Sequence, residues 1–343
     1  MYLNRVNIKS KIRQICRAKS DLPGKQIPDF NMESRSRRSF LRGTAAAGAA
    51  LMAAPVLLSG KSRSAAVSDA DKPFRLAYAP SIGMFRELCG SDDPLDNVQF
   101  IADKGFRALF DNGFPGRPAE EQEQIATKIQ NMGLMMGPWV LHADFGNTSF
   151  VLPHREVRDF LTSKMEEGIE VARRSGFKMA LVVPGRYDYR IHPDIQLANV
   201  IENLKYCADL VGPEGMTLVL EPLNTLRDHP GLWLTQMPQA YQVCKAVNSP
   251  AVKIVEDIYH QQISEGNLIP NIETCWDEIA AFHVGDNPGR NEPTTGEINF
   301  KNIFSYLLSR DYKGVICMEH GRSIRGAAGV RRVIEAYREC DPF

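Results

Sequence analysis

The stretch IAAFHVGDNPGRNEPTTGEINF, residues 279–300, begins as an apolar run and continues as a loop rich in proline and glycine. Its first four residues have the composition of a buried strand, in which both faces are covered and polar alternation is missing. His283, two acidic residues and Arg290 follow within a few positions. A parallel strand that ends in such residues and enters a Gly/Pro-rich loop is typical of active-site loops in α/β barrels. We therefore expect residues 283–300 to belong to a functional site, with an ordinary polar loop as the alternative.

Outward from this stretch, short apolar runs alternate with longer amphipathic stretches from residue 74 onward. Residues 157–172 and 195–208 carry apolar side chains three and four positions apart, which predicts helices that bury one face. The apolar runs, each about as long as a buried parallel strand, are residues 74–79, 106–110, 134–141, 179–183, 217–220, 252–255, 279–284 and 314–318. Eight strands that alternate with helices predict an α/β fold, a single (β/α)8 TIM barrel, over residues 71–343.

A doubly wound open sheet is the rival to this barrel. Such a sheet more often has six strands and carries a glycine-rich loop after its first strand. The loop after residues 74–79 reads Pro80-Ser81-Ile82-Gly83 and contains no GxGxxG motif. The barrel is therefore the favoured interpretation.

Composition excludes some classes of partner. The 343 residues are 43% hydrophobic and 24% charged, with a formal net charge of +0, which is ordinary for a globular protein. The sequence has no excess of basic residues of the kind that binds nucleic acid, so we expect no nucleic-acid partner. The composition does not distinguish a monomer from a homo-oligomer.

The first 70 residues are predicted to form an N-terminal extension that precedes the barrel. The sequence SRRSFLR at residues 36–42 is followed by an uncharged run rich in alanine and glycine at residues 43–60, and then by small residues at 64–66. This order is typical of a twin-arginine export signal with cleavage near residues 60–70. The apolar run is shorter than the roughly 20 residues that span a bilayer. We expect a periplasmic or extracytoplasmic mature protein without a stable membrane span; a short anchor or a basic tail is the alternative.

Four residues able to bind a metal stand at the ends of the last four predicted strands: Glu221, Asp257, His283 and Glu319. The carboxyl ends of barrel strands meet at one mouth, so these side chains are expected to converge. Burying three carboxylates together is costly unless a cation compensates them. Three carboxylates and one imidazole are a mostly hard-oxygen ligand set, which favours Mn²⁺ or Mg²⁺, with Co²⁺ or Zn²⁺ as alternatives.

The segments EPLN, DIYHQQ, HVGDNPGRNEPTTGEINF and MEHG, which contain these residues, resemble the signature segments of the hydroxypyruvate isomerase family of xylose-isomerase-like barrels. The resemblance covers about residues 74–337. It implies one divalent metal held by Glu221, Asp257, residue 283 and Glu319, with the two glutamates also serving as the acid–base pair. Residue 283 departs from the family pattern, since hydroxypyruvate isomerases usually have glutamine there and histidine is typical of the related ketose 3-epimerases.

Such a site suits isomerisation through an enediolate, in which a proton moves between adjacent carbons. A cation stabilises the developing oxyanion, and carboxylates such as Glu221 and Glu319 flank the substrate. The expected reaction interconverts a small hydroxy-carbonyl substrate, with hydroxypyruvate and tartronate semialdehyde as the named pair. A ketose 3-epimerase, an inositol-type dehydratase and a non-catalytic exported sugar-binding protein stay open as alternatives.

Four residues are candidates for contact with the substrate. Arg290 offers a planar fork that suits a carboxylate or carbonyl, although a solvent salt bridge is the alternative. His260 follows Asp257 by three residues, and the family resemblance implies that it binds a substrate oxygen; a surface histidine is the alternative. Asn224 and His229, in the loop after residues 217–220, are candidates of second rank.

Overall fold

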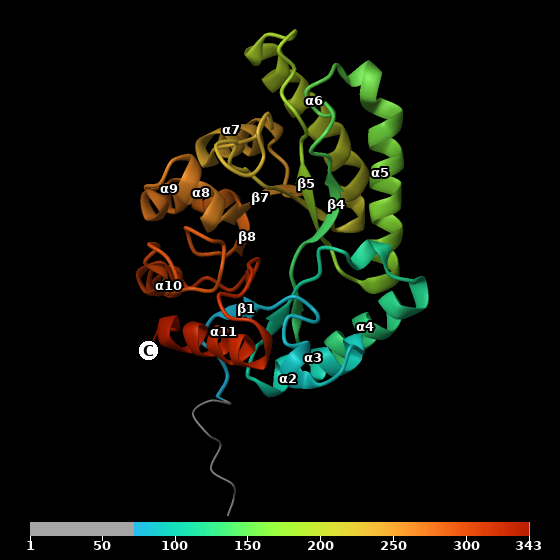
Figure 1. Cartoon of the computed structure of the whole chain (residues 1–343). Coiled ribbons are helices and arrows are strands. Elements are labelled where there is room, and N and C mark those ends of the chain that lie inside the picture. The colour runs from blue at the N-terminus through green and yellow to red at the C-terminus, as the bar shows by residue number, and fades with distance from the viewer. Residues whose placement is uncertain (1–71, 343) are drawn as a thin grey trace, which may run out of the picture. The chain divides into compact units, whose positions relative to one another are not determined.

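The computed structural model describes residues 72–342, which form one α/β unit (Figure 1). The predicted extension and its twin-arginine motif at residues 36–42 lie outside the described residues. Within the described part of the chain, no helix combines the length and the hydropathy that crossing a membrane would require.

Seven strands form a parallel sheet in the order β1-β9-β8-β7-β6-β5-β4. The two remaining described strands, β2 and β3, form a parallel pair of their own. The bounds are β1 (Ala77–Ala79), β2 (Ala108–Leu109), β3 (Met135–Met136), β4 (Trp139–Ala143), β5 (Met179–Val183), β6 (Thr217–Leu220), β7 (Val252–Asp257), β8 (Ile279–His283) and β9 (Val315–Cys317).

Backbone hydrogen bonds join the β2–β3 pair to both edges of the larger sheet. A parallel bridge pairs Ser81, just after β1, with Phe110, just after β2. On the other side the amide of Val140 in β4 donates to the carbonyl of Asn112 (3.2 Å). The strands therefore follow one another around a common axis, and the predicted TIM barrel is confirmed.

The third predicted strand, residues 134–141, is interrupted and forms β3 and β4 instead of one strand. Pro138 has no amide hydrogen to donate to a neighbouring strand. Gly137 lies so close to the barrel interior that a Cβ there would come within 2.8 Å of Cys317 Sγ and 2.9 Å of Phe110 Cβ. The break thus has a local cause, and the order of strands around the barrel is unchanged.

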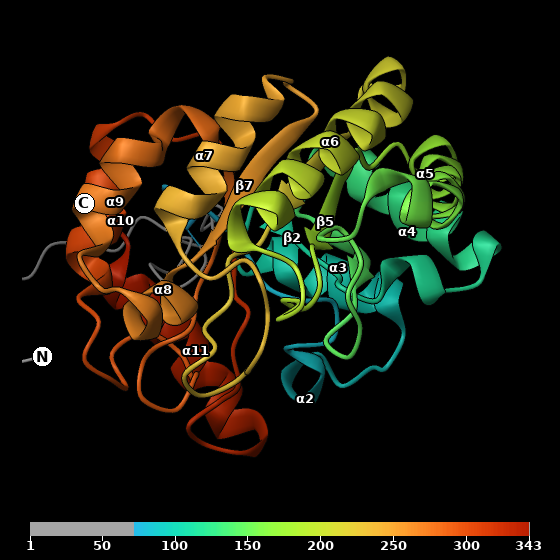
Figure 2. The same ribbon diagram turned by 90° about the horizontal axis from the view of Figure 1, so that it is seen from above.

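The helices surround the strands, as Figures 1 and 2 show. Helix α5 buries most of the apolar stripe that its sequence predicts, including Val157, Leu161 and Met165, but leaves Phe160 exposed. It ends at Gly176, whose φ of 77° is the left-handed conformation that glycine favours. The helices are α2 (Arg86–Cys89), α3 (Pro94–Asp103), α4 (Ala119–Asn131), α5 (His154–Ser175), α6 (Pro193–Val211), α7 (Met237–Val247), α8 (Ile258–Ser264), α9 (Leu268–Cys275), α10 (Phe300–Ser309) and α11 (Gly326–Cys340), with 3₁₀ turns at η2 (Phe114–Gly116), η3 (Gly212–Glu214) and η4 (Trp276–Glu278).

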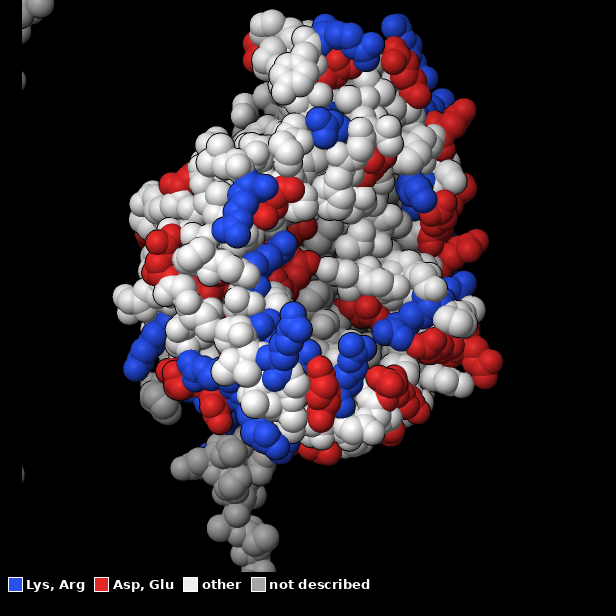
Figure 3. Space-filling model, viewed as in Figure 1, with Lys and Arg blue, Asp and Glu red and all other residues white. Residues whose placement is uncertain are grey.

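Two apolar layers hold the barrel together. Small and branched residues such as Ala79, Val219 and Val255 fill its interior. A larger layer lies between strands and helices and includes Ile254 and Phe282. The loops that follow the strands lie on the side facing the viewer in Figure 1, and in Figure 2 this side, which carries α8, is at the bottom. The space-filling view of this face has a hollow near its centre with charged side chains at its edge (Figure 3).

Candidate metal centre and active site

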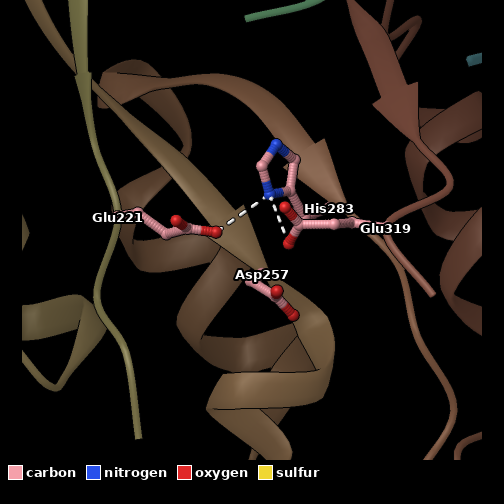
Figure 4. A group of neighbouring side chains, drawn as sticks. All are labelled: Glu221, Asp257, His283 and Glu319. Carbon is pink, nitrogen blue, oxygen red and sulfur yellow. Dashed lines mark hydrogen bonds and ion pairs between the residues drawn. The ribbon is translucent and has the colours of Figure 1, made fainter. Parts of the chain in front are cut away.

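The four predicted ligands converge at the mouth of the barrel. Glu221 follows β6, Asp257 and His283 end β7 and β8, and Glu319 lies just after β9. The sheet register places Asp257 directly opposite His283. Each of the four residues offers one ligand atom, and these atoms all lie within 4.8 Å of one another (Figure 4). The structure therefore brings together the residues that the strand ends suggested.

Two cationic or protonatable groups lie between the three carboxylates. His283 Nδ1 is 2.9 Å from Glu221 Oε1 and 3.2 Å from Glu319 Oε2. Arg290 Nη2 donates to Asp257 Oδ2 (2.9 Å) and to Glu319 Oε2 (2.6 Å). Three carboxylates thus share one guanidinium and one imidazole, which leaves the cluster with an excess of negative charge.

A divalent cation fits this donor set. Asp257 and His283 are fully buried and Glu221 nearly so, and buried anions require compensation. Carboxylate oxygens with one imidazole suit Mn²⁺ or Mg²⁺. The residues that would hold the ion are Glu221, Asp257, His283 and Glu319, and His283 Nδ1 is the nitrogen that faces the carboxylates.

The two glutamates occupy different electrostatic surroundings. Burial, together with the charge of Glu319, raises the pKa of Glu221 to about 7. Burial alone would also raise the pKa of Glu319, but the charges of His283 and Arg290, with hydrogen bonds from His283 and Asn112, hold that pKa well below its usual range. Paired acid–base groups in enzymes typically show pKa values that the environment separates in this way.

The loop after β8 delivers Arg290 to the cluster. Buried Asp286 accepts hydrogen bonds from the amides of Asn287, Gly296 and Ile298, which fixes the turn. The Arg290 guanidinium also lies 5.0 Å from the centre of the Tyr259 ring. Its ion pairs are with two metal-ligand candidates, Asp257 and Glu319, and not with an acid at the solvent-exposed surface.

Asn112, which sequence reasoning missed, completes the surroundings of Glu319. It lies in the loop after β2, and its Nδ2 donates to Glu319 Oε1 at 2.6 Å. Its Oδ1 is buried without a hydrogen-bond partner among the described residues. The sequence does indicate this position: Asn112 follows the apolar run 106–110, and polar residues just after any barrel strand are expected to face the mouth.

The remaining candidates lie beside Asp257. The His260 amide donates to Asp257 Oδ1 (3.0 Å) as part of the N-cap of α8, and its Nε2 lies 3.6 Å from Asp257 Oδ2. Asn224 is fully buried against His260. His229 is further out, with its ring 5.3 Å from that of His260 and stacked at 4.7 Å on Phe145. Burial and the charge of Arg290 lower the pKa of His229.

Comparison with known proteins gives matches over most of the barrel. The family model described as "Xylose isomerase-like TIM barrel" matches residues 98–340. The chain is 36% identical over 262 residues to hydroxypyruvate isomerase of Escherichia coli K12, covering 75% of this chain and 97% of that protein. It is 27% identical over 237 residues to a 2-oxo-tetronate isomerase of Pectobacterium atrosepticum, covering 66% and 86%. In fold it is similar to a 3-keto-D-glucoside 4-epimerase of E. coli, with a TM-score of 0.62, 21% identity and coverage of 78% and 100%.

Proposed function

Because the chain belongs to the xylose isomerase-like TIM barrel family and is an isomerase of the hydroxypyruvate isomerase type, we propose that it catalyses metal-dependent isomerisation of a small hydroxy-carbonyl compound. The substrate pair that we propose is hydroxypyruvate and tartronate semialdehyde. The observation that carries the proposal is the convergence of Glu221, Asp257, His283 and Glu319 at the barrel mouth. Two of these residues are glutamates in different electrostatic surroundings, as an acid–base pair requires.

The chain's own residues account for the proton transfer. One glutamate takes the proton from the hydroxyl-bearing carbon beside the carbonyl, which gives an enediolate, and a glutamate returns a proton to the former carbonyl carbon. The hydroxyl proton passes to the former carbonyl oxygen, so the product is an isomer with no net gain or loss of atoms. A bound divalent cation would stabilise the negative charge that develops on oxygen. Arg290 and Asn112, which hydrogen-bond opposite oxygens of Glu319, keep its carboxylate in one orientation.

Two buried donors beside the cluster support binding of an oxygen-rich substrate. Arg290 Nε and His260 Nε2 are buried and have no hydrogen-bond partner among the described residues. An unsatisfied buried donor costs about 1–3 kcal/mol, so a substrate carboxylate or carbonyl that accepts from these groups gains that amount on binding. A short 2-oxo acid carries both kinds of acceptor.

The proposal is tested by deuterium exchange. The mature protein with Mn²⁺ in D₂O is incubated with hydroxypyruvate, tartronate semialdehyde and several ketoses, and deuterium at carbon is followed by NMR. We expect metal-dependent exchange that disappears in Glu319→Gln and persists in Glu202→Gln, an exposed glutamate on α6. Absence of exchange with every compound, in protein that binds Mn²⁺, would contradict the proposal.

A ketose 3-epimerase is the second candidate, favoured by the histidine at position 283. An epimerase would use the same two glutamates but return the proton to the carbon that lost it, with inverted configuration. The same spectra separate the two reactions. Exchange at C3 of a ketose with appearance of the C3 epimer favours epimerisation, whereas a carbonyl that moves to the neighbouring carbon favours isomerisation.

We also propose that the barrel acts outside the cytoplasm, on the strength of the motif at residues 36–42. Replacing both Arg37 and Arg38 by lysine is expected to keep the protein in the cytoplasm of a host with a twin-arginine pathway, because that pathway reads the arginine pair. Fractionation and immunoblotting measure the location. Unchanged export of the double variant would contradict this route.

A further inference from the structure

Asn224 uses the whole hydrogen-bonding capacity of its side chain inside the protein. An asparagine amide offers two donors on nitrogen and two lone pairs on oxygen. The Oδ1 of Asn224 accepts from the amides of Arg227 and Asp228, each at 3.1 Å. Its Nδ2 donates to Asp228 Oδ2 at 2.8 Å and to His260 Nδ1 at 2.6 Å. No group of this side chain is left for a substrate, so a direct contact, as the sequence suggested, is not the role that the geometry favours.

The same contacts determine the tautomer of His260. Because the Oδ1 of Asn224 is held by two backbone amides, its nitrogen must face the imidazole. The backbone amide of Asn224 also donates to His260 Nδ1, at 3.3 Å. An Nδ1 that receives two donors carries no hydrogen, and the hydrogen of the neutral ring then sits on Nε2. The doubly protonated ring would need both nitrogens as donors, so an Nδ1 that accepts also excludes the charged form.

The hydrogen on Nε2 is the one that the active site can use. His260 Nε2 is buried, has no hydrogen-bond partner among the described residues, and lies 3.6 Å from Asp257 Oδ2 in the metal centre. We propose that Asn224 is a positioning residue that fixes His260 as the Nε2–H tautomer, so that this ring presents a neutral hydrogen-bond donor to a substrate oxygen beside the metal. The kinetic consequence rests on the proposed function, whereas the tautomer itself does not.

A second asparagine–histidine pair has the opposite polarity and serves as an internal reference. The Nδ2 of Asn203 donates to the carbonyls of Phe150 (2.8 Å) and Leu152 (3.0 Å). Its Oδ1 therefore faces His154 Nδ1, at 2.9 Å, and must accept from it. His154 is expected to carry its hydrogen on Nδ1, although both histidines contact an asparagine side chain through the same ring atom.

The tautomers are read directly by long-range ¹H–¹⁵N correlation spectra of the Mg²⁺-loaded mature protein with ¹⁵N-labelled histidine. At about pH 8 an ordinary histidine, with a pKa of about 6.5, is neutral, so each ring has one protonated nitrogen. His260→Gln and His154→Gln variants assign the two rings. We expect hydrogen on Nε2 of His260 and on Nδ1 of His154 in the same spectrum. Hydrogen on Nδ1 of His260 in the wild-type protein would overturn the inference.

Two variants then test the role of the asparagine side chain. In Asn224→Asp the new carboxylate can only accept, so the His260 hydrogen should move to Nδ1, and in Asn224→Ala the two tautomers should coexist. Both variants should lower kcat/KM about 10- to 100-fold, as for other residues that orient an active-site histidine, with unchanged Mn²⁺ affinity. Thermal melting identifies a variant that does not fold. If one variant fails this test, the tautomer and activity of the other variant decide whether Asn224 positions His260.

The outcomes separate this inference from the proposed function. An Nε2–H tautomer that persists in both variants, or full activity in both, would overturn the positioning role while leaving the isomerase proposal standing. Absence of turnover in the wild-type protein would contradict the isomerase proposal, and the spectra would still decide the tautomer.

Discussion

Two neighbouring carboxylates of β7 point to opposite faces of the barrel wall. Strand residues alternate between faces, and Val255 lies in the barrel interior while Ile254 lies in the layer beneath the helices. Asp257 therefore faces the mouth and Glu256 faces the helices. Asp257 accepts hydrogen bonds from the His260 amide and from Arg290. Glu256 is fully buried, and neither of its carboxyl oxygens has a hydrogen-bond partner among the described residues.

The two carboxyl groups differ in their surroundings: Asp257 has charged partners at the proposed active site, whereas Glu256 is buried without any among the described residues. At the mouth, burial is offset by His283, Arg290 and the expected cation, so three carboxylates can lie together. Beneath the helices, burial raises the pKa of Glu256 well above its ordinary value, because burial disfavours the charged form of the carboxyl group. No contact within the described residues explains why a carboxyl group stands at position 256. Variants on the two faces should accordingly affect different properties.

The largest expected effect is on catalysis, from Glu319→Gln. The amide keeps the size of the side chain but cannot take up a proton, so the exchange rate should fall by about 10³- to 10⁴-fold. Exchange in D₂O measures it. Glu256→Gln, one position from a metal ligand but on the other face, should retain the wild-type rate. Equal loss in both variants would contradict the separation of the two faces.

A smaller effect is expected on metal binding, from Asp257→Asn. The substitution removes a negative ligand and leaves the Arg290 guanidinium without one of its two carboxylate partners. Mn²⁺ affinity, measured by calorimetry on the purified protein, should fall by about 100-fold or more. Affinity within a few-fold of the wild-type value would show that the ion binds elsewhere.

Arg290→Lys should weaken substrate use by about 10-fold. Lysine keeps the positive charge but lacks the planar fork that reaches two carboxylates and a substrate at once. We expect a higher KM for hydroxypyruvate with little change in Mn²⁺ affinity. Arg173, an exposed residue of α5 that pairs with Glu214, offers a matched control in Arg173→Lys. An unchanged KM would remove Arg290 from substrate binding.

The smallest expected effect is on the free energy of unfolding, and here the substitution is expected to improve the property instead of impairing it. Glu256→Gln removes a carboxyl group whose charged form is disfavoured by burial, so at neutral pH it should stabilise the metal-free protein by about 1–2 kcal/mol. The folded-state pKa of Glu256 is above the unfolded value, so the wild-type protein loses stability as pH rises from about 4.5 towards the folded pKa.

Denaturant titrations at several pH values measure this difference. The gap between Glu256→Gln and wild type should therefore widen as pH rises through that window. Exposed Glu166→Gln on α5 should show no such dependence. A constant gap, or a destabilised Glu256→Gln, would indicate that the carboxyl group has a partner.

The sequence predicted much of the site because strand ends follow a simple rule. Glu221, Asp257, His283 and Glu319 each follow an apolar run, and parallel strands bring such positions to one mouth. Asn112 obeys the same rule, but it is an amide and not one of the carboxylate or imidazole residues that mark the last four strand ends as a metal site. The role of Asn224 could not be predicted, because three of its side-chain hydrogen bonds lie within the loop after β6 and the fourth, to His260, forms only when that loop packs against α8. The break at Gly137 likewise depends on contacts with Phe110 and Cys317, which are distant in sequence.

The most direct test of the metal-centred account is to titrate Mn²⁺ into the metal-free protein while deuterium exchange into hydroxypyruvate is followed by NMR. The account predicts no exchange in the presence of a chelator, a rate that rises with added Mn²⁺, and saturation at one ion per chain. Exchange that persists with the chelator, or an Asp257→Asn variant that matches the wild-type titration, would contradict it.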